Sequence, residues 1–240
     1  MENIISVSDL SFGYDRKRKV LENINFQLKK GESVGLVGAN GVGKSTLLRI
    51  LVGLNTGFQG DVMVNNIPLE KKNLKTIRKN VGYVFQDADS QLFMSTVFDD
   101  VAFAPRNYGM SEAEVNEKTM EALKVVHIEQ LKDKQIYKLS GGEKKLASIA
   151  TILSTEPDVI LMDEPSVAFD PKNRRNLINI LNQLNQAKII ASHDLNMIMD
   201  TCERTILLSD GKVIKDGNTK EILLDKELME ESGLELPLGY

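Results

Sequence analysis

The 240-residue chain is long enough for one α/β domain with a small attached subdomain, and its 42% hydrophobic and 27% charged residues are ordinary for a globular protein. A formal net charge of −4 argues against a nucleic-acid binder that relies on bulk positive charge. The single cysteine, Cys202, excludes an internal disulfide and a zinc site built from several cysteines.

The N-terminal residues, MENIISVSDLSFGY, contain no basic stretch followed by an apolar run, so we expect no secretory signal. No stretch approaches the roughly 20 apolar residues that are needed to cross a bilayer. The sequence therefore predicts a cytoplasmic protein, which would need the spanning segments of another protein to act across a membrane.

Taken in chain order, the apolar pattern predicts alternating strands and helices. Residues 3–8 and 20–28 alternate apolar and polar positions, which is typical of half-buried antiparallel strands, and a polar turn joins them. Residues 33–37 form a buried-strand pattern that runs into a glycine-rich loop and an apolar-periodic helix. Further buried strands are predicted at 159–163, 188–192 and 205–209, with a helix at 174–186. This alternation predicts an α/β fold with a largely parallel sheet and helices on both faces.

Residues 87–149 have a helical pattern without a convincing strand. Within this segment, Ser111 is a candidate helix cap and Glu114 follows it in the first turns. We therefore expect an inserted helical subdomain here, with residues 1–86 and 150–240 forming the core of the same domain.

The residues GANGVGKST match the phosphate-binding pattern G-x-x-x-x-G-K-[ST], after a buried strand and at the start of a helix. Glycines let backbone N–H groups converge on phosphate oxygens, and the helix N-terminus adds partial positive charge. Lys44 would reach the β- and γ-phosphates, and the Ser45 hydroxyl would coordinate Mg²⁺. The loop thus predicts a site for ATP and Mg²⁺, with nucleotide contacts expected from Gly38, Asn40, Gly41, Gly43, Lys44, Ser45 and Thr46.

A pair of carboxylates ends the buried strand VILMD. Asp163 and Glu164 stand together at its carboxyl end, where α/β sheets place their ligands. Asp163 could hold the hydration shell of Mg²⁺, and Glu164 could polarise an attacking water. Together with the phosphate loop, the pair predicts ATP hydrolysis.

The stretch KLSGGEKKLASIA resembles the signature sequence of the ABC ATPases, which is usually written LSGGQ. Ser140, Gly141 and Gly142 would open a helix and provide a second phosphate-binding N-terminus. Alone, a Ser-Gly-Gly turn before a helix is more often only a cap. In this family, its position shortly before VILMDEP implies that it faces the nucleotide of a second subunit.

Four further positions match the ABC family one by one. The resemblance implies that Gln86 joins the core to the helical subdomain and senses Mg²⁺ and the attacking water. It also implies that Asp170 lies at a dimer interface, that His193 contacts the γ-phosphate and that Tyr14 stacks on adenine. The motifs cover nearly the whole chain in the family's order. They imply an ABC transporter ATP-binding subunit, with a RecA-like phosphate-loop core, an antiparallel β subdomain and a helical subdomain.

The sequence departs from the family pattern at several positions. Glu143 replaces the usual glutamine of the signature, Lys144 and Lys145 stand where an arginine is common, and Phe169 stands where leucine is more usual. A carboxylate near a γ-phosphate should repel it, yet the first turn of a helix tolerates negative charge. We expect an effect of Glu143 on rate, and hydrolysis itself to be retained.

The segment after Gln86, DADSQLFMSTVFDDVAFAPRNYGM, resembles that of the cobalt/nickel and energy-coupling-factor importer cassettes, as does the tail MEESGLELP. The resemblance implies a membrane importer for a metal ion, vitamin or other small nutrient, peripheral on the cytoplasmic face of the cell membrane. Its partners would be a second cassette, identical or homologous, and an integral membrane subunit, without nucleic acid. The apolar residues expected either to dock membrane-partner helices or to form subdomain core are Leu92, Phe93, Met94, Phe98 and Phe103.

Other interpretations stay open. The chain could serve another type of ABC transporter, or be a soluble ABC ATPase, although that class usually brings a coiled-coil insertion, zinc cysteines or two fused cassettes. A non-hydrolysing module would be expected to lack Glu164 or His193. The run 16–19 is expected at a solvated hairpin tip or near the nucleotide base, and His127 lies outside any motif.

Overall fold

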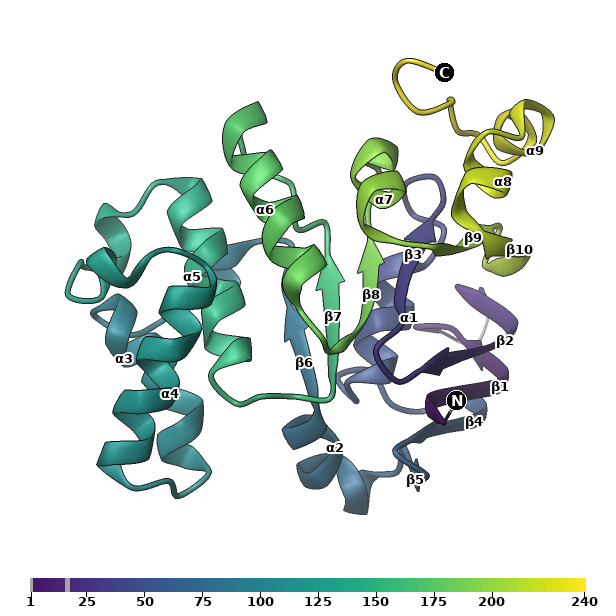
Figure 1. Cartoon of the computed structure of the whole chain (residues 1–240). Coiled ribbons are helices and arrows are strands. Elements are labelled where there is room, and N and C mark those ends of the chain that lie inside the picture. Colours follow the sequence, from purple (N-terminus) through teal and green to yellow (C-terminus); the bar gives the residue numbers. More distant parts are fainter. Residues whose placement is uncertain (1, 16–17) are drawn as a thin grey trace. The chain divides into compact units, whose positions relative to one another are not determined.

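The computed structural model describes residues 2–15 and 18–240 and divides into two compact units (Figure 1). The first unit contains residues 1–83, 158–164 and 185–240, and the second contains residues 84–157 and 165–184. Each unit has its own packed interior. The limits predicted for the helical subdomain, 87–149, stay a prediction.

The first unit holds an antiparallel four-stranded sheet with the strand order β2-β1-β4-β5. The alternation that predicted two strands is confirmed: in β2, the side chains of Leu21, Ile24, Phe26 and Leu28 are buried and their neighbours are more exposed. Arg16 and Lys17, at the predicted hairpin tip, lie outside the described residues. The strands are β1 (Asn3–Phe12), β2 (Leu21–Lys29), β4 (Gln59–Val64) and β5 (Ile67–Pro68).

A second sheet in the same unit has six strands in the order β10-β9-β3-β8-β7-β6. β3 pairs parallel with β8 and β9, β7 pairs parallel with β8, and β10 pairs antiparallel with β9. Every residue of β7 and β8 is buried, as expected of a parallel sheet covered on both faces. The strands are β3 (Ser33–Val37), β6 (Val81–Val84), β7 (Val159–Asp163), β8 (Ala187–Ala191), β9 (Arg204–Ser209) and β10 (Lys212–Asn218).

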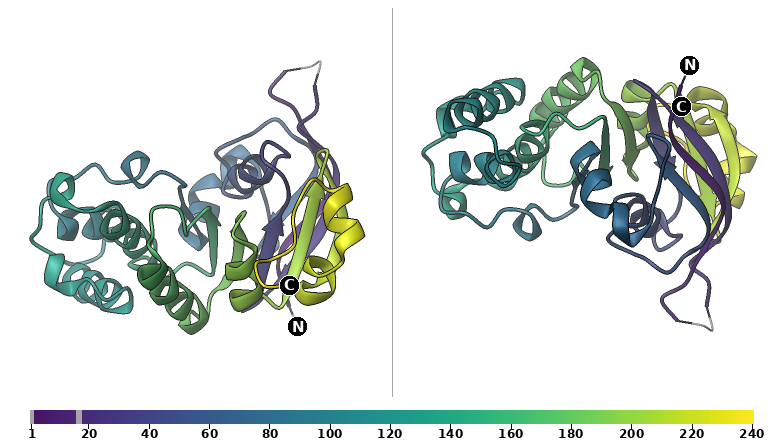
Figure 2. Two further views of the ribbon diagram at one scale, coloured as in Figure 1. Left: turned by 90° about the horizontal axis from the view of Figure 1, so that it is seen from above. Right: turned by 90° about the horizontal axis from the view of Figure 1, so that it is seen from below.

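Helices of the first unit pack on this sheet. α1 contacts β7, α7 contacts β3, and α8 contacts β9 and β10; Figure 2 shows the C-terminal helices beside these last two strands. Because β3, β7 and β8 are parallel, their carboxyl ends meet at one edge, towards which the arrowheads of β7 and β8 point in Figure 1. The helices are α1 (Lys44–Leu51), α2 (Leu74–Asn80), α7 (Leu195–Thr201), α8 (Thr219–Leu223) and α9 (Lys226–Glu231).

The second unit is helical. α3, α4 and α5 pack against one another, and the predicted cap of α4 is confirmed, because the Ser111 hydroxyl accepts from the Glu114 amide while the Glu114 carboxylate accepts from Ser111. Within α3, the buried Asp100 accepts from the backbone amides of Phe93 and Met94, which precede the helix. The helices are α3 (Val97–Asn107), α4 (Glu112–Val125), α5 (Gly141–Leu153) and α6 (Pro171–Gln183), with short 3₁₀ turns at Ala88–Ser90, Glu129–Leu131 and Ile136–Lys138.

Arg204 ties the two sheets of the first unit together. From β9, its guanidinium donates to both oxygens of Asp216, at 2.6 and 2.7 Å, to the backbone oxygen of Gln27 in β2 and to Glu32. A planar guanidinium can serve such a divergent set of acceptors because its donors point in fixed directions.

We predict that Arg204→Met lowers the free energy of unfolding by about 2 kcal/mol, since several charge-assisted hydrogen bonds are lost and their acceptors stay partly buried. Urea denaturation followed by circular dichroism measures this loss. The matched control is Lys212→Met, because Lys212 forms an exposed ion pair with Glu22 at 3.3 Å, and such pairs contribute under about 1 kcal/mol. Equal losses in the two variants would contradict the bridging role of Arg204.

Candidate functional site

A glycine-rich loop, residues 38–43, connects the buried strand β3 to α1. Gly41 and Gly43 have φ angles of 82° and 111°, a left-handed region that glycine adopts readily. A Cβ on Gly43 would lie 2.7 Å from Cδ2 of Leu21, so a larger residue would also clash there. The loop thereby places the N-terminus of α1 at the carboxyl edge of the sheet, where the helix dipole attracts anions.

Lys44 is the first residue of α1, and its side chain turns back onto this loop. Its side chain is buried, and its ammonium donates to the carbonyl oxygens of Gly38 at 2.6 Å and Ala39 at 3.2 Å. Burial lowers the pKa of Lys44, while the negative charges of Glu164 and Asp163 oppose that shift. The loop therefore encloses a positive charge beside two carboxylates, an arrangement suited to a polyanion that brings its own cation.

Ser45 and Asp163 come together from segments far apart in the sequence. The Ser45 hydroxyl donates to Asp163 Oδ1 at 3.0 Å, and the Tyr83 hydroxyl donates to Asp163 Oδ2 at 3.0 Å. Asp163 is only 1% exposed. The pKa of Tyr83 is raised by the burial of its own hydroxyl and by the negative charge of Asp163. Tyr83 is thus held as a neutral phenol that orients the Asp163 carboxylate towards Ser45.

Glu164 and His193 form a second pair at the same edge. His193 Nδ1 lies 2.7 Å from Glu164 Oε2, which also accepts from the Ser192 hydroxyl and from the His193 amide. The Glu164 side chain is buried, its backbone adopts a φ of 48°, and the imidazole is 63% exposed. The Glu164 carboxylate is therefore held in a fixed orientation beside an accessible imidazole.

Tyr14 lies beside the phosphate loop. Its hydroxyl shares a hydrogen bond of 3.2 Å with Thr46 and accepts another from Asn55, and its ring packs edge-on against Phe12. The Tyr14 side chain is 63% exposed. An aromatic ring that is fixed at its hydroxyl and open on its surface offers a platform for a planar ligand.

In the second unit, Ser140 caps the N-terminus of α5. Its hydroxyl accepts from the Glu143 amide, and the Glu143 carboxylate accepts from the Ser140 amide at 2.7 Å. Gly141 and Gly142 pack closely on the turn at 168–169, where added Cβ atoms would meet Ala168 and a Phe169 ring carbon at 3.3 Å. Ser140 and Gly141 are exposed and Gly142 is half-buried, so α5 begins with an accessible N-terminus whose first two residues carry no side chains.

The departure at Glu143 has a physical explanation. Both of its carboxylate oxygens lie 3.0 Å from the Lys134 ammonium. Burial alone would raise the pKa of Glu143, but the Ser140 amide and Lys134 outweigh burial and lower it. The Glu143 carboxylate is thus bound to the Ser140 amide of the helix cap and paired with the Lys134 ammonium. This pairing reduces the expected repulsion between Glu143 and a phosphate.

Of the remaining predicted residues, Gln86 and Asp170 belong to the second unit. Gln86 is exposed and stands two positions after the end of β6, and Asp170 caps α6 by accepting from the Asn173 amide and side chain, each at 2.9 Å. Asn40, in the first unit, is exposed. The structure therefore gathers the phosphate-loop, acidic and histidine residues in one unit and the Ser-Gly-Gly turn in the other.

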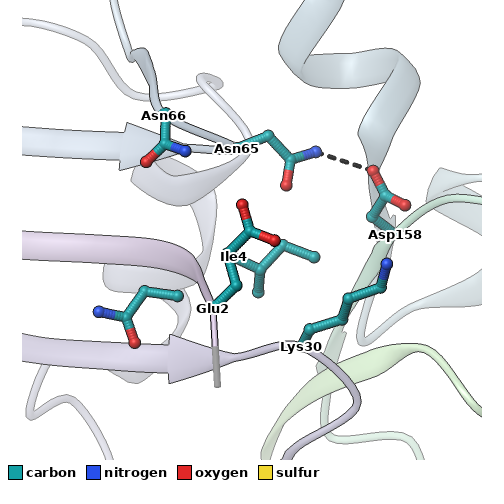
Figure 3. Close-up of a pocket in the computed structure, with 7 residues that line it drawn as sticks. Glu2, Ile4, Lys30, Asn65, Asn66 and Asp158 are labelled. Carbon is teal, nitrogen blue, oxygen red and sulfur yellow. Dashed lines mark hydrogen bonds between the residues drawn. The ribbon is translucent and has the colours of Figure 1, made fainter.

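A polar pocket of about 190 Å³ lies elsewhere in the first unit (Figure 3). The Asn65 amide donates to Asp158 at 2.8 Å across it. Asp158 and Lys30 precede the amino ends of β7 and β3, whereas Lys44 and Glu164 follow the carboxyl ends of these strands. The pocket is therefore separate from the candidate site. It is lined by Glu2, Asn3, Ile4, Lys30, Asn65, Asn66 and Asp158.

Three residues that support the site were not predicted from the sequence: Tyr83, Ser192 and Lys134. Ser192 directly precedes His193, and Tyr83 stands three positions before Gln86, so their neighbourhood is the only sequence signal for them. Lys134 has no such signal, because nothing local shows that its ammonium reaches Glu143.

Comparisons with known proteins agree with this geometry. The family model described as ABC transporter matches residues 21–167. A protein of Geobacter sulfurreducens whose name assigns it to the ABC transporter ATP-binding proteins is 47% identical over 237 residues, which cover 99% of this chain and 95% of that protein. The energy-coupling factor transporter ATP-binding protein EcfA of Methanocaldococcus jannaschii is 40% identical, with 98% of this chain and 86% of that protein covered.

Two solved structures share the fold. The structure of cbiO1 from Clostridium perfringens, part of the ABC transporter complex cbiONQ, superposes with a TM-score of 0.86 at 35% identity, covering 96% of this chain and 94% of that one. The ATP-binding cassette MJ0796, in a dimeric post-hydrolysis state with ADP and Pi, superposes with a TM-score of 0.80 at 28% identity, covering 90% and 98% of the two chains. With its phosphate-loop NTPase fold, this chain belongs to the ABC transporter family, as an ATP-binding subunit of the ABC ATPases.

Proposed function

We propose that this chain hydrolyses ATP, as one of a pair of cassettes, to power a membrane importer for a metal ion, a vitamin or another small nutrient. The observation that carries the proposal is the assembly of Lys44, the Ser45–Asp163 pair and the Glu164–His193 pair at one edge of the sheet. Each group has a task in phosphoryl transfer to water, which depends on positioning and charge neutralisation.

The nucleotide would be bound by the glycine-rich loop. The amide groups and the α1 N-terminus, together with Lys44, would neutralise the phosphate oxygens, and the exposed ring of Tyr14 would stack on adenine. The Lys44 side chain already lies on the loop, with its ammonium on the Gly38 carbonyl. When ATP is bound, the Lys44 ammonium would bind phosphate oxygens in place of the neutral Gly38 carbonyl. These oxygens gain negative charge during transfer, which the ammonium would stabilise.

The residues present fit a Mg²⁺ ion. Hydroxyl and carboxylate oxygens are the donors that Mg²⁺ prefers, and it is commonly held by one or two such groups together with substrate phosphates and water. Ser45 and Asp163 supply a hydroxyl and a carboxylate 3.0 Å apart. Ser45 would bind the ion, Asp163 would hold its water shell and Gln86 would complete the set. When bound, Mg²⁺ would neutralise charge on the phosphates.

The hydrolytic step would depend on Glu164. Its carboxylate, held by Ser192 and the His193 amide, would accept the proton of the attacking water. With a proton on each ring nitrogen, His193 would donate from Nδ1 to Glu164 and from Nε2 to the γ-phosphate. The exposure of this imidazole fits that contact.

A second cassette would complete each site. The accessible Ser140–Gly142 turn, with its paired Glu143 carboxylate, would bind the γ-phosphate held by the other cassette, and Asp170 would lie at the interface. Support comes from the dimeric form of the similar cassette MJ0796. An open helix N-terminus bearing glycines suits close approach to an anion.

The membrane partner would dock on the second unit. Phe93 and Phe103 are exposed and pack edge to face with ring centroids 4.7 Å apart, so large apolar side chains gather on the surface before and along α3. The similar proteins EcfA and cbiO1 carry transporter names, the latter as part of cbiONQ. No helix in the described part of the chain is long and apolar enough to cross a membrane. The cassette would lie on the cytoplasmic face of the membrane.

The test is purification of the tagged chain from detergent-solubilised membranes, in parallel with the Phe93→Asp/Phe103→Asp variant. We expect an integral membrane protein to accompany the wild type and the Leu238→Asp control, whose changed side chain is exposed elsewhere, but not the double variant. Soluble partners alone, or ribosomes, would overturn the transport assignment and leave the ATPase chemistry standing. The identity of a recovered membrane subunit would narrow the substrate.

A further inference from the structure

The backbone on which Gln86 stands is held by a buried lysine. Lys145, in the second turn of α5, is 2% exposed, and its ammonium donates to the carbonyl oxygens of Phe85 at 2.7 Å and Gln86 at 2.8 Å. Two consecutive carbonyls bound to one ammonium fix the orientation of both peptide groups. In a buried setting these bonds are stronger than they would be in water.

Gln91 holds the same segment from its other end. Its side-chain oxygen accepts from the Phe85 amide at 3.1 Å, and its side-chain nitrogen donates to Ser148 and Thr151 of α5 at 2.7 and 2.8 Å. The amide and the carbonyl of Phe85 are thus both held by side chains tied to α5 or belonging to it.

An outer contact completes this arrangement. Lys144, the neighbour of Lys145, forms an ion pair of 2.6 Å with Asp89. The stretch 85–91 is therefore attached along the first three turns of α5, the helix that begins at the Ser140–Gly142 turn. All of these contacts lie within the second unit.

We propose that Lys145 is a positioning residue that fixes Gln86 relative to the Ser140–Gly142 turn. The inference rests on the proposed function, in which Gln86 approaches Mg²⁺ and the attacking water while the Ser-Gly-Gly turn binds the nucleotide of the other cassette. With Lys145 in place, the two elements move as one body, so a displacement of the turn carries the Gln86 backbone with it. The ammonium of Lys145 is bound to the carbonyls of Phe85 and Gln86, so its effect on hydrolysis would pass through Gln86.

The first test measures the attachment directly, without nucleotide. In Lys145→Met, which keeps the length and apolar stem of the side chain, backbone amides of residues 84–91 are expected to exchange hydrogen for deuterium faster than in the wild type, while α4 keeps its protection. Lys145→Arg, which keeps donors, restores protection. Lys124→Met, the same change at an exposed position of α4, is the control. Unchanged exchange in residues 84–91 of Lys145→Met would overturn the proposal.

The second test is a double-mutant cycle with Gln86. Lys145→Met is expected to lower kcat for ATP by about 10- to 100-fold, as misplacement of a reacting geometry does, with KM unchanged because the phosphate loop is untouched. If Lys145 acts through Gln86, Lys145→Met causes no further loss in a Gln86→Ala chain. Losses that multiply in the double variant, or a raised KM with kcat intact, would overturn the proposal. Failure of the wild type to hydrolyse ATP would instead refute the proposed function, and hydrogen exchange would still decide the role of Lys145.

Discussion

Lys44→Met is expected to lower kcat/KM for ATP by about 10²- to 10³-fold, through loss of both nucleotide binding and turnover. Methionine is similar in length to lysine and apolar, so the buried side chain can remain in the loop while the ammonium is lost. The carbonyls of Gly38 and Ala39 lose the bonds from the Lys44 ammonium, and the carboxylates Asp163 and Glu164 lose the positive charge that acts on the same site. Phosphates would then meet uncompensated negative charge.

Steady-state turnover and equilibrium titration with a fluorescent ATP analogue measure the effect of Lys44→Met. Lys71→Met is the matched control, since Lys71 is an exposed lysine of the same unit. Retention of wild-type affinity by Lys44→Met would show that the glycine-rich loop is not the phosphate site.

Glu164→Gln is expected to reduce kcat by about 10²- to 10⁴-fold, the range associated with a general base, while ATP binding persists. The amide oxygen of glutamine can still accept from Ser192 and the His193 amide, as Glu164 Oε2 does. The geometry is therefore kept, and only the capacity to take a proton is lost. Because ATP is no longer consumed, the pair of cassettes closed on ATP should accumulate.

Kinetic assays of Glu164→Gln measure the loss of kcat. Light scattering with and without Mg²⁺–ATP measures whether the pair of cassettes accumulates. Glu117→Gln, an exposed position on α4, controls for the change of charge. A Glu164→Gln chain that hydrolyses ATP at the wild-type rate would exclude Glu164 as the base. A variant that binds ATP and stays monomeric at high protein concentration would contradict the paired model.

Short-range patterns predicted the strands and loops that carry the site. The buried strands at 33–37 and 159–163 are confirmed, since continuous apolar runs with polar groups at their carboxyl ends leave few other structures. The glycine-rich loop could be predicted because phosphate binding requires glycine, lysine and a hydroxyl residue at fixed spacing. The strands β4, β5, β6 and β10 were not predicted: β6 has only four residues, and β10 is largely exposed, so neither has a long periodic signal.

The hydrogen bonds that hold the site residues from distant segments could not be predicted from the sequence. Tyr83 and Ser45 meet on Asp163, and Lys145 reaches the Phe85 carbonyl, because the fold joins segments 60 or more positions apart. Such polar side chains form no pattern in the sequence, and their placement depends on packing that local propensity does not describe. Glu143 shows the same limit, because its charge is offset by the Lys134 ammonium.

The central claim, that each nucleotide site is shared between two cassettes, is tested most directly by mixing two inactive variants. Glu164→Gln removes the base beside the phosphate loop, and Ser140→Arg blocks the turn that would face the other cassette. In a mixed pair, one site receives both changes and the other receives neither, so the account predicts that the mixture regains ATP turnover which neither variant shows alone. A mixture that stays as inactive as its two components, although co-purification through different tags on the two variants shows mixed pairs, would mean that each chain forms its site alone and would contradict the claim.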